Sequence, residues 1–231
     1  MSADSVPLVT GLALRAENVT AGYGGDPVIR GITVSADPAE IISLVGPNGS
    51  GKSTLLKSLA GILRVAPGRV LVGGADLTNT APEEIARARV GYVPQVDDVF
   101  APLTVRENLE MGGYLLRRAE VPGRIERAMA VFPRLAGMLT RPAGRLSGGE
   151  RKMLAMARVL MLEPGLFLLD EPTANLAPKV AAELLGEHVR RLAESGATVL
   201  IVEQRARAVL AEGTMADLRA RSEVVEAYLV G

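Results

Sequence analysis

Short apolar runs alternate with amphipathic segments along most of the chain, and this pattern predicts strands and helices in turn. Residues 12–23 and 27–37 alternate apolar and polar positions with a period of two, which is typical of a partly exposed antiparallel sheet. Residues 40–46 form a short apolar strand that ends in glycine, and residues 52–61 have helical spacing. Two further short segments predict a small hairpin at residues 68–78 and a strand at residues 90–95.

The pattern changes after this strand, because the next three amphipathic segments have helical spacing and no strand separates them. An apolar strand, a long helix and a second apolar strand then follow at residues 166–170, 178–195 and 197–204. Strands that alternate with helices imply a mainly parallel sheet, here with an all-helical insertion.

We therefore predict a single α/β domain over residues 1–231. Residues 1–95 and 165–231 would form the core with its β subdomain, and residues 96–164 the helical subdomain.

The composition narrows the class of protein. The chain carries 26 basic and 26 acidic side chains, so a broad basic surface for nucleic acid is not expected. The absence of cysteine excludes disulfides, thiolate metal sites and cysteine nucleophiles. No basic residue precedes the first apolar run, and no apolar run reaches membrane-spanning length. We expect a soluble cytoplasmic protein without a signal peptide.

Residues 46–54, GPNGSGKST, fit the pattern G-x-x-x-x-G-K-[ST] between a predicted strand and a predicted helix, which is the context that the motif requires. Gly49 and Gly51 let the backbone curl so that successive N–H groups face one anion, to which the helix N-terminus adds partial positive charge. Lys52 would reach the β- and γ-phosphates, and the Ser53 hydroxyl would ligate Mg²⁺. The residues expected to contact the nucleotide here are Gly46, Asn48, Gly49, Ser50, Gly51, Lys52, Ser53 and Thr54.

Asp170 and Glu171 come directly after the apolar run at residues 166–169. On a parallel strand they would lie at the carboxyl edge of the sheet, where α/β proteins bind ligands. Asp170 suits a Mg²⁺ partner, directly or through water, and Glu171 suits the general base that polarises an attacking water. The plainer interpretation is an exposed pair of carboxylates in a turn, but the phosphate loop predicts just such a strand.

A second phosphate-binding helix N-terminus is formed by Ser147, Gly148 and Gly149, which precede a predicted helix. A kinase or a small GTPase has no use for such a second site. With the phosphate loop and the acidic pair, the sequence resembles the ATP-binding cassette (ABC) ATPases over nearly its whole length. The resemblance implies a RecA-like P-loop NTPase core with an antiparallel β subdomain and an all-helical insertion. It also implies that two domains bind head to tail, so that these three residues contact the γ-phosphate of the partner's ATP.

Three further positions match the family one at a time. Tyr23 matches the aromatic residue that stacks on adenine, and an ordinary exposed tyrosine is the plainer interpretation. Gln95 matches the glutamine that contacts Mg²⁺ and water and that couples the ATP site to the membrane partner. Asn175 lies in the loop that crosses the dimer interface, where glycine is common, and asparagine tolerates left-handed backbone best among the other residues.

Gln204 stands where the family usually has a histidine that contacts the γ-phosphate. The amide can donate a hydrogen bond but cannot carry charge, so we expect no histidine-like pH step in activity from this position. The implied catalytic set is thus Glu171, Gln204, Lys52 and Gln95. The one histidine of the chain, His188, lies mid-helix, where we expect a solvated helix face.

The chain is unusually short after Gln204. Relatives normally form a helix, a strand and a hairpin before a segment similar to residues 209–214, whereas here only residues 205–208 intervene. About 15 to 20 residues, roughly one helix and one strand, are missing from the family pattern. The missing strand would lie at or near a sheet edge, so its loss need not destroy the core. A natural trimming, a degenerate copy and an error in the sequence are the alternatives.

Residues 107–114, 202–204 and 226–231 are most similar to the ATPase subunits of branched-chain amino acid uptake systems. The resemblance implies a peripheral subunit on the cytoplasmic face of the membrane that hydrolyses ATP with Mg²⁺. Its implied partners are integral-membrane permease subunits, a second ABC ATPase subunit in a hetero- or homodimer and, indirectly, a periplasmic or extracellular solute-binding protein. The helical insertion and Gln95 would form the groove in which the permease docks.

Two alternatives fit the residues less well. A soluble ABC protein that acts on ribosomes or DNA usually carries two cassettes or a long coiled-coil insertion, and this chain has one cassette and no such heptads. A degenerate, non-hydrolysing nucleotide-binding module would fit the short C-terminal region, but Lys52, Asp170 and Glu171 are all present.

Overall fold

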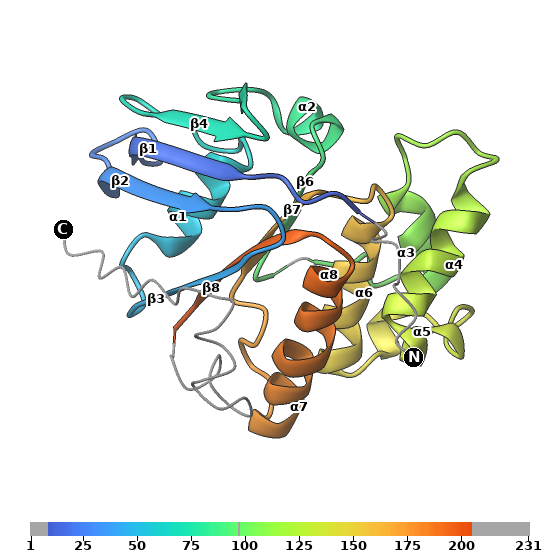
Figure 1. Ribbon diagram of the computed structural model, residues 1–231. Coiled ribbons are helices and arrows are strands. Elements are labelled where there is room, and N and C mark those ends of the chain that lie inside the picture. The colour runs from blue at the N-terminus through green and yellow to red at the C-terminus, as the bar shows by residue number, and fades with distance from the viewer. Residues whose placement is uncertain (1–8, 97, 205–231) are drawn as a thin grey trace, which may run out of the picture.

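The computed structural model describes residues 9–96 and 98–204, which form two sheets and a group of helices (Figure 1). One sheet is antiparallel with strand order β2-β1-β4-β5, and the other is parallel with order β3-β8-β7-β6. The strands are β1 (Leu14–Ala21), β2 (Ile29–Ala36), β3 (Ile41–Val45), β4 (Arg69–Val72), β5 (Ala75–Asp76), β6 (Val90–Val93), β7 (Leu166–Asp170) and β8 (Thr198–Glu203). The predicted α/β fold with an antiparallel sheet is confirmed.

The part of the chain between β6 and β7 contains helices and no strand in its described residues, as the sequence pattern predicted. The α-helices are α1 (Lys52–Leu59), α2 (Pro82–Arg87), α3 (Val105–Gly112), α4 (Val121–Val131), α5 (Pro133–Ala136), α6 (Gly148–Leu160), α7 (Pro178–Glu183) and α8 (Arg190–Glu194). A short 3₁₀ helix, η1 (Ala143–Arg145), and a π-helix, η2 (Leu184–Val189), complete the set. In the described ranges, no helix is both long and apolar enough to cross a membrane.

The parallel sheet is buried on both of its faces. Phe167 and Leu169 of β7 belong to one apolar cluster with residues of α3, α4, α5, α6, η2 and α8. Leu166 and Leu168 of the same strand belong to a second cluster, which contains α1 and the antiparallel sheet. Burial on both sides explains why these strands read as continuous apolar runs and not as alternating ones.

The predicted long helix at residues 178–195 is helical from Pro178 to Glu194, but a wide π-helical turn, η2, lies between α7 and α8. The expectation that His188 lies on a solvated helix face is wrong, because its side chain is 1% exposed. The π turn holds more residues than an α turn, which changes the face on which its side chains lie. The imidazole packs against Phe132, with 5.4 Å between ring centroids, and burial lowers the pKa of His188.

Helix α6 is held closely against α3. At Gly112, an added Cβ would lie 2.2 Å from the carbonyl oxygen of Arg158, so the two helices approach each other as closely as glycine allows. This contact fixes the helix whose N-terminus is formed by Ser147, and it therefore positions one of the expected phosphate-binding turns.

We expect Gly112→Ala to destabilise the protein by about 1–3 kcal/mol, because the methyl group has to displace backbone at the helix contact. Gly123→Ala is the matched control, since Gly123 lies in α4 with nothing within 4 Å of the added Cβ. The control should gain up to about 1 kcal/mol from better helix propensity. Urea unfolding of both variants measures the difference, and equal effects would contradict the close contact.

Candidate functional site

The phosphate loop links β3 to α1 and has the curled backbone that the sequence predicted. Gly49 and Gly51 have φ values of 83° and 88°, in the left-handed region that favours glycine. An added Cβ at Gly51 would also lie 2.3 Å from Cγ2 of Ile29. Glycine is required at Gly51 for both its conformation and this close approach.

A cavity of about 260 Å³ lies over this loop and brings several of the predicted residues together. Its lining residues are Val28, Asn48, Gly49, Gly51, Lys52, Ser53, Thr54, Gln95 and Glu171. Ser50 Oγ is buried beside it with no hydrogen-bond partner in the described part of the chain. The residues that follow β3, β6 and β7 thus meet at one edge of the sheet, as the parallel arrangement requires.

Asp170, the last residue of β7, is buried and accepts two hydrogen bonds. Ser53 Oγ donates to its Oδ1 at 2.8 Å, and the Tyr92 hydroxyl donates to its Oδ2 at 3.1 Å. Burial, and after it the charge of Asp170, raises the pKa of Tyr92, which therefore keeps its proton and remains a donor. The sequence did not single out Tyr92 as a site residue. Its position in the strand, three residues before Gln95, could have indicated that it lies near the site.

Glu171 faces the cavity and contacts two of the predicted residues. Gln95 Nε2 donates to its Oε2 at 2.8 Å, and Lys52 Nζ lies 3.8 Å from its Oε1. Glu171 has a φ of 43°, in left-handed backbone that costs a non-glycine residue of order 1–3 kcal/mol. The turn at the end of β7 thereby separates the two carboxylates, with Asp170 toward Ser53 and Glu171 toward Gln95.

Glu203, which ends β8, is a buried carboxylate that the sequence analysis did not select. Its Oε1 accepts hydrogen bonds from the Thr173 backbone N–H at 3.0 Å and from the Thr173 hydroxyl at 2.7 Å. Burial raises the pKa of Glu203 against the effect of these bonds. The contact ties the segment after Glu171 to β8. Gln204 is exposed beside it, and the shortened segment at residues 205–214 lies outside the described residues.

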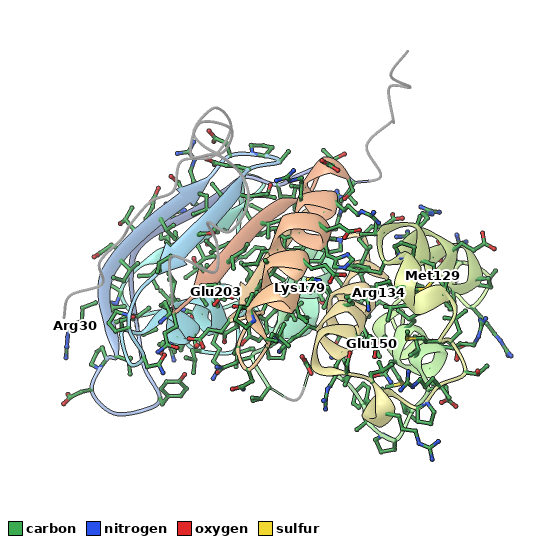
Figure 2. All side chains as sticks on the ribbon, turned by 90° about the horizontal axis from the view of Figure 1, so that it is seen from below. Arg30, Met129, Arg134, Glu150, Lys179 and Glu203 are labelled. Carbon is green, nitrogen blue, oxygen red and sulfur yellow. The ribbon has the colours of Figure 1, made fainter. Side chains whose placement is uncertain are left out.

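The turn of Ser147, Gly148 and Gly149 opens α6 with a capping box. The Ser147 backbone N–H donates to Glu150 Oε2 at 2.8 Å, and this bond lowers the pKa of Glu150. None of the three residues lines the cavity of the phosphate loop. Figure 2 shows Glu150 on the helical side of the molecule, well away from Glu203 at the sheet edge. The two expected phosphate-binding turns are therefore not brought together by the described part of a single chain.

Two other predicted positions are Tyr23 and Asn175, and both lie outside the lining of the cavity. Tyr23 is 60% exposed in the loop between β1 and β2, and Lys57 Nζ lies 5.4 Å from its ring centroid. It does not line the cavity, although Val28 from the same loop does. Asn175 has a φ of 62°, so the left-handed backbone expected at this position is present.

One further group of side chains resembles a metal site. Ligand atoms of Glu183, Glu187 and His188 lie within 4.8 Å of one another. However, Arg134 pairs with Glu183 at 2.6 Å, and Arg191 pairs with Glu187 at 2.8 Å. Both carboxylates are already neutralised, so the group does not favour a cation.

Glu203→Gln should change how stability depends on pH. Because the folded pKa of Glu203 is raised above the ordinary value of 4.5, the native state holds a proton that the unfolded state has lost. The contribution of Glu203 to the free energy of unfolding therefore falls as pH rises from its pKa in the unfolded chain to its higher pKa in the folded protein. The loss persists at neutral pH. Glutamine keeps the acceptor for Thr173 without the charge.

Unfolding by urea at several pH values should show the Glu203→Gln variant gaining stability relative to the wild type as pH rises above the ordinary value of 4.5, until the folded carboxyl group is itself ionised. Other titrating groups cancel in this comparison because both proteins share them. A constant difference across the range would show that the Glu203 carboxylate titrates alike in both states.

Comparisons with known proteins agree with this geometry. A family model described as ABC transporter matches residues 29–174. The chain is 41% identical to the probable branched-chain amino acid transport ATP-binding protein LivF of Archaeoglobus fulgidus, over 85% of this chain and 84% of that protein. It is 38% identical to the high-affinity branched-chain amino acid transport ATP-binding protein BraG of Pseudomonas aeruginosa, over 84% and 83% of the two chains.

Solved structures are similar as well. A nucleotide-free ATP-binding cassette from an ABC transporter matches with a TM-score of 0.78 and 30% identity, over 86% of this chain and 84% of that one. The ADP conformation of an ABC transporter cassette matches with a TM-score of 0.76 and 32% identity, over 87% and 84%.

Proposed function

The chain belongs to the ABC transporter family, and from this we propose that it binds and hydrolyses ATP to power solute transport through separate permease subunits. The observation that carries the proposal is the hydrogen bond between Gln95 and Glu171 at the phosphate-loop cavity. It puts the expected general base beside the loop that would hold the γ-phosphate. A non-hydrolysing module would not need a carboxylate kept there by a left-handed backbone.

The side chains of the cavity suit the steps of hydrolysis. Lys52 Nζ donates to the carbonyl oxygens of Gly46 and Pro47 at 2.8 and 2.9 Å, and phosphate oxygens would take over these bonds. Glu171 would accept the proton of the attacking water, with its carboxylate oriented by Gln95. Gln204, exposed at the end of β8, would donate to the γ-phosphate.

The donors near Ser53 fit Mg²⁺. Ser53 Oγ, the Asp170 carboxylate and the amide oxygen of Gln95 are all oxygen ligands, which Mg²⁺ prefers. We expect these three residues to hold the ion directly or through water. When bound, it supplies positive charge to the β- and γ-phosphate oxygens.

A second cassette is needed to complete the site. Ser147, Gly148 and Gly149 stand at a helix N-terminus that suits an anion but lies outside the cavity of its own chain. In a head-to-tail dimer they would contact the partner's γ-phosphate, and Tyr23 would stack on the adenine of its own ATP. The partner is a second ABC ATPase subunit, identical or different.

A groove on the helical side would receive the permease. It has a volume of about 480 Å³ and lies between α2, β6, α3 and α6. Gln95, which the sequence placed in this groove, lines the phosphate-loop cavity instead. Its apolar lining includes Phe100, Met111 and Tyr114, which are each 45–60% exposed. An exposed apolar hollow of this kind suits a short helix of a membrane partner, which would place the subunit at the cytoplasmic face of the membrane.

The solute is proposed from the named relatives. Two of them are transport proteins for branched-chain amino acids, so we propose import of branched-chain or related amino acids. A solute-binding protein outside the cytoplasm would deliver the solute to the permease.

Glu171→Gln should trap ATP between two cassettes, because the amide keeps the shape of the expected base but cannot accept the proton. Size-exclusion chromatography with light scattering should show a dimer that requires ATP and Mg²⁺. Glu194→Gln, an exposed carboxylate on α8, is the control and should give no stable dimer. A Glu171→Gln chain that binds ATP but stays monomeric, alone and with a candidate partner subunit, would contradict the closed dimer.

Gln204→His should add a pH-dependent step to ATP binding. An imidazole beside the γ-phosphate gains charge as pH falls through about 6.5, so KM for ATP should decrease toward acid pH in the variant and not in the wild type. The wild type offers a clean background, because its one histidine, His188, is buried with a lowered pKa. Identical acid limbs of the KM profiles in both proteins would place residue 204 away from the phosphate.

A further inference from the structure

Lys152, in the second turn of α6, is a charged side chain whose buried ammonium group makes two short polar contacts. It is 7% exposed. Its Nζ donates to the backbone carbonyl oxygen of Gln95 at 2.6 Å and lies 2.7 Å from Asp98 Oδ2. Asp98 is 6% exposed, so this is an ion pair shielded from water. A buried ammonium group is stable only where polar or charged groups lie close to it. For Lys152, both of these groups lie in the segment that follows β6.

Gln95 is held from two sides. Its carbonyl accepts from Lys152, and its side-chain amide donates to Glu171. Only one residue therefore separates the ammonium group of Lys152 from the expected general base. At the other end, Lys152 lies five residues after Ser147 on the same helix, which is about 7–8 Å along the axis.

We propose that Lys152 is a positioning residue that fixes Gln95 to α6, so that the Gln95 amide and the N-terminal turn of α6 move as one unit. The inference rests on the proposed function. In a closed dimer, the Ser147 turn would meet the partner's ATP, while Lys152 on the same helix holds Gln95 over the ATP of its own chain. Occupation of one site thus changes the geometry of the other, and the two sites hydrolyse cooperatively.

A loss of fold has to be separated from a loss of positioning. Lys152→Met alone leaves Asp98 as an uncompensated buried charge, which destabilises the protein whatever the role of the lysine. The double variant Lys152→Met/Asp98→Asn removes both charges and should recover most of the stability. It still leaves the Gln95 carbonyl without its donor. The double variant therefore tests positioning in a folded chain.

The experiment compares wild type, Lys152→Met, the double variant and Arg124→Met. Arg124 is the control, since its ion pair is also partly shielded but is made with Glu163 and not with the segment that contains Gln95 and Asp98. For each protein, urea unfolding gives the stability, fluorescent ATP gives the dissociation constant, and steady-state hydrolysis gives kcat and the Hill coefficient for ATP.

We expect the double variant to bind ATP within about twofold of wild type, while kcat falls by about tenfold or more and the Hill coefficient drops toward 1. Arg124→Met should keep the wild-type kcat and Hill coefficient. A double variant with recovered stability and wild-type kcat and Hill coefficient would overturn the inference and leave Lys152 a purely structural role. A wild-type protein that binds but does not hydrolyse ATP would instead count against the proposed function.

Discussion

Burial of the parallel sheet on both faces is the constraint from which the site arises. Helices cover one face and the antiparallel sheet with α1 covers the other, so the strands are apolar along their lengths. Polar side chains collect where the strands end. Gln95 follows β6, Asp170 and Glu203 are the last residues of β7 and β8, and the phosphate loop follows β3. Because the strands are parallel, these ends meet at one edge, and a phosphate loop, a carboxylate pair and an amide come together there.

The local motifs were readable from the sequence because they depend on short-range geometry. The curl at Gly49 and Gly51 and the left-handed Asn175 follow from which residues tolerate positive φ. The two apolar strands that carry Asp170 and Glu203 followed from hydrophobic runs of the right length. These features need no knowledge of what packs against them.

The contacts that the sequence did not predict all join segments far apart in the chain. Tyr92 to Asp170, Lys152 to Asp98 and Glu203 to Thr173 each depend on the way in which helices and strands pack. A lysine is expected on the surface from its sequence alone, because lysine is rarely buried unless a carboxylate pairs with it. His188 was misplaced for another reason: helical periodicity assumes an α turn, and the π turn of η2 changes which residues face inward.

His188 also makes one contact between helices observable: the contact of η2, in the long helix at residues 178–194, with the helical layer formed by α3 to α6. The chain contains a single imidazole, and its ring packs against Phe132 where α4 meets α5. Its carbon-bound protons would give one isolated set of resonances in an otherwise crowded NMR spectrum, shifted by the neighbouring ring. The protein thus carries a native spectroscopic probe, without labels or added residues, of how the helical layer sits on the nucleotide-binding core while ATP is bound and turned over.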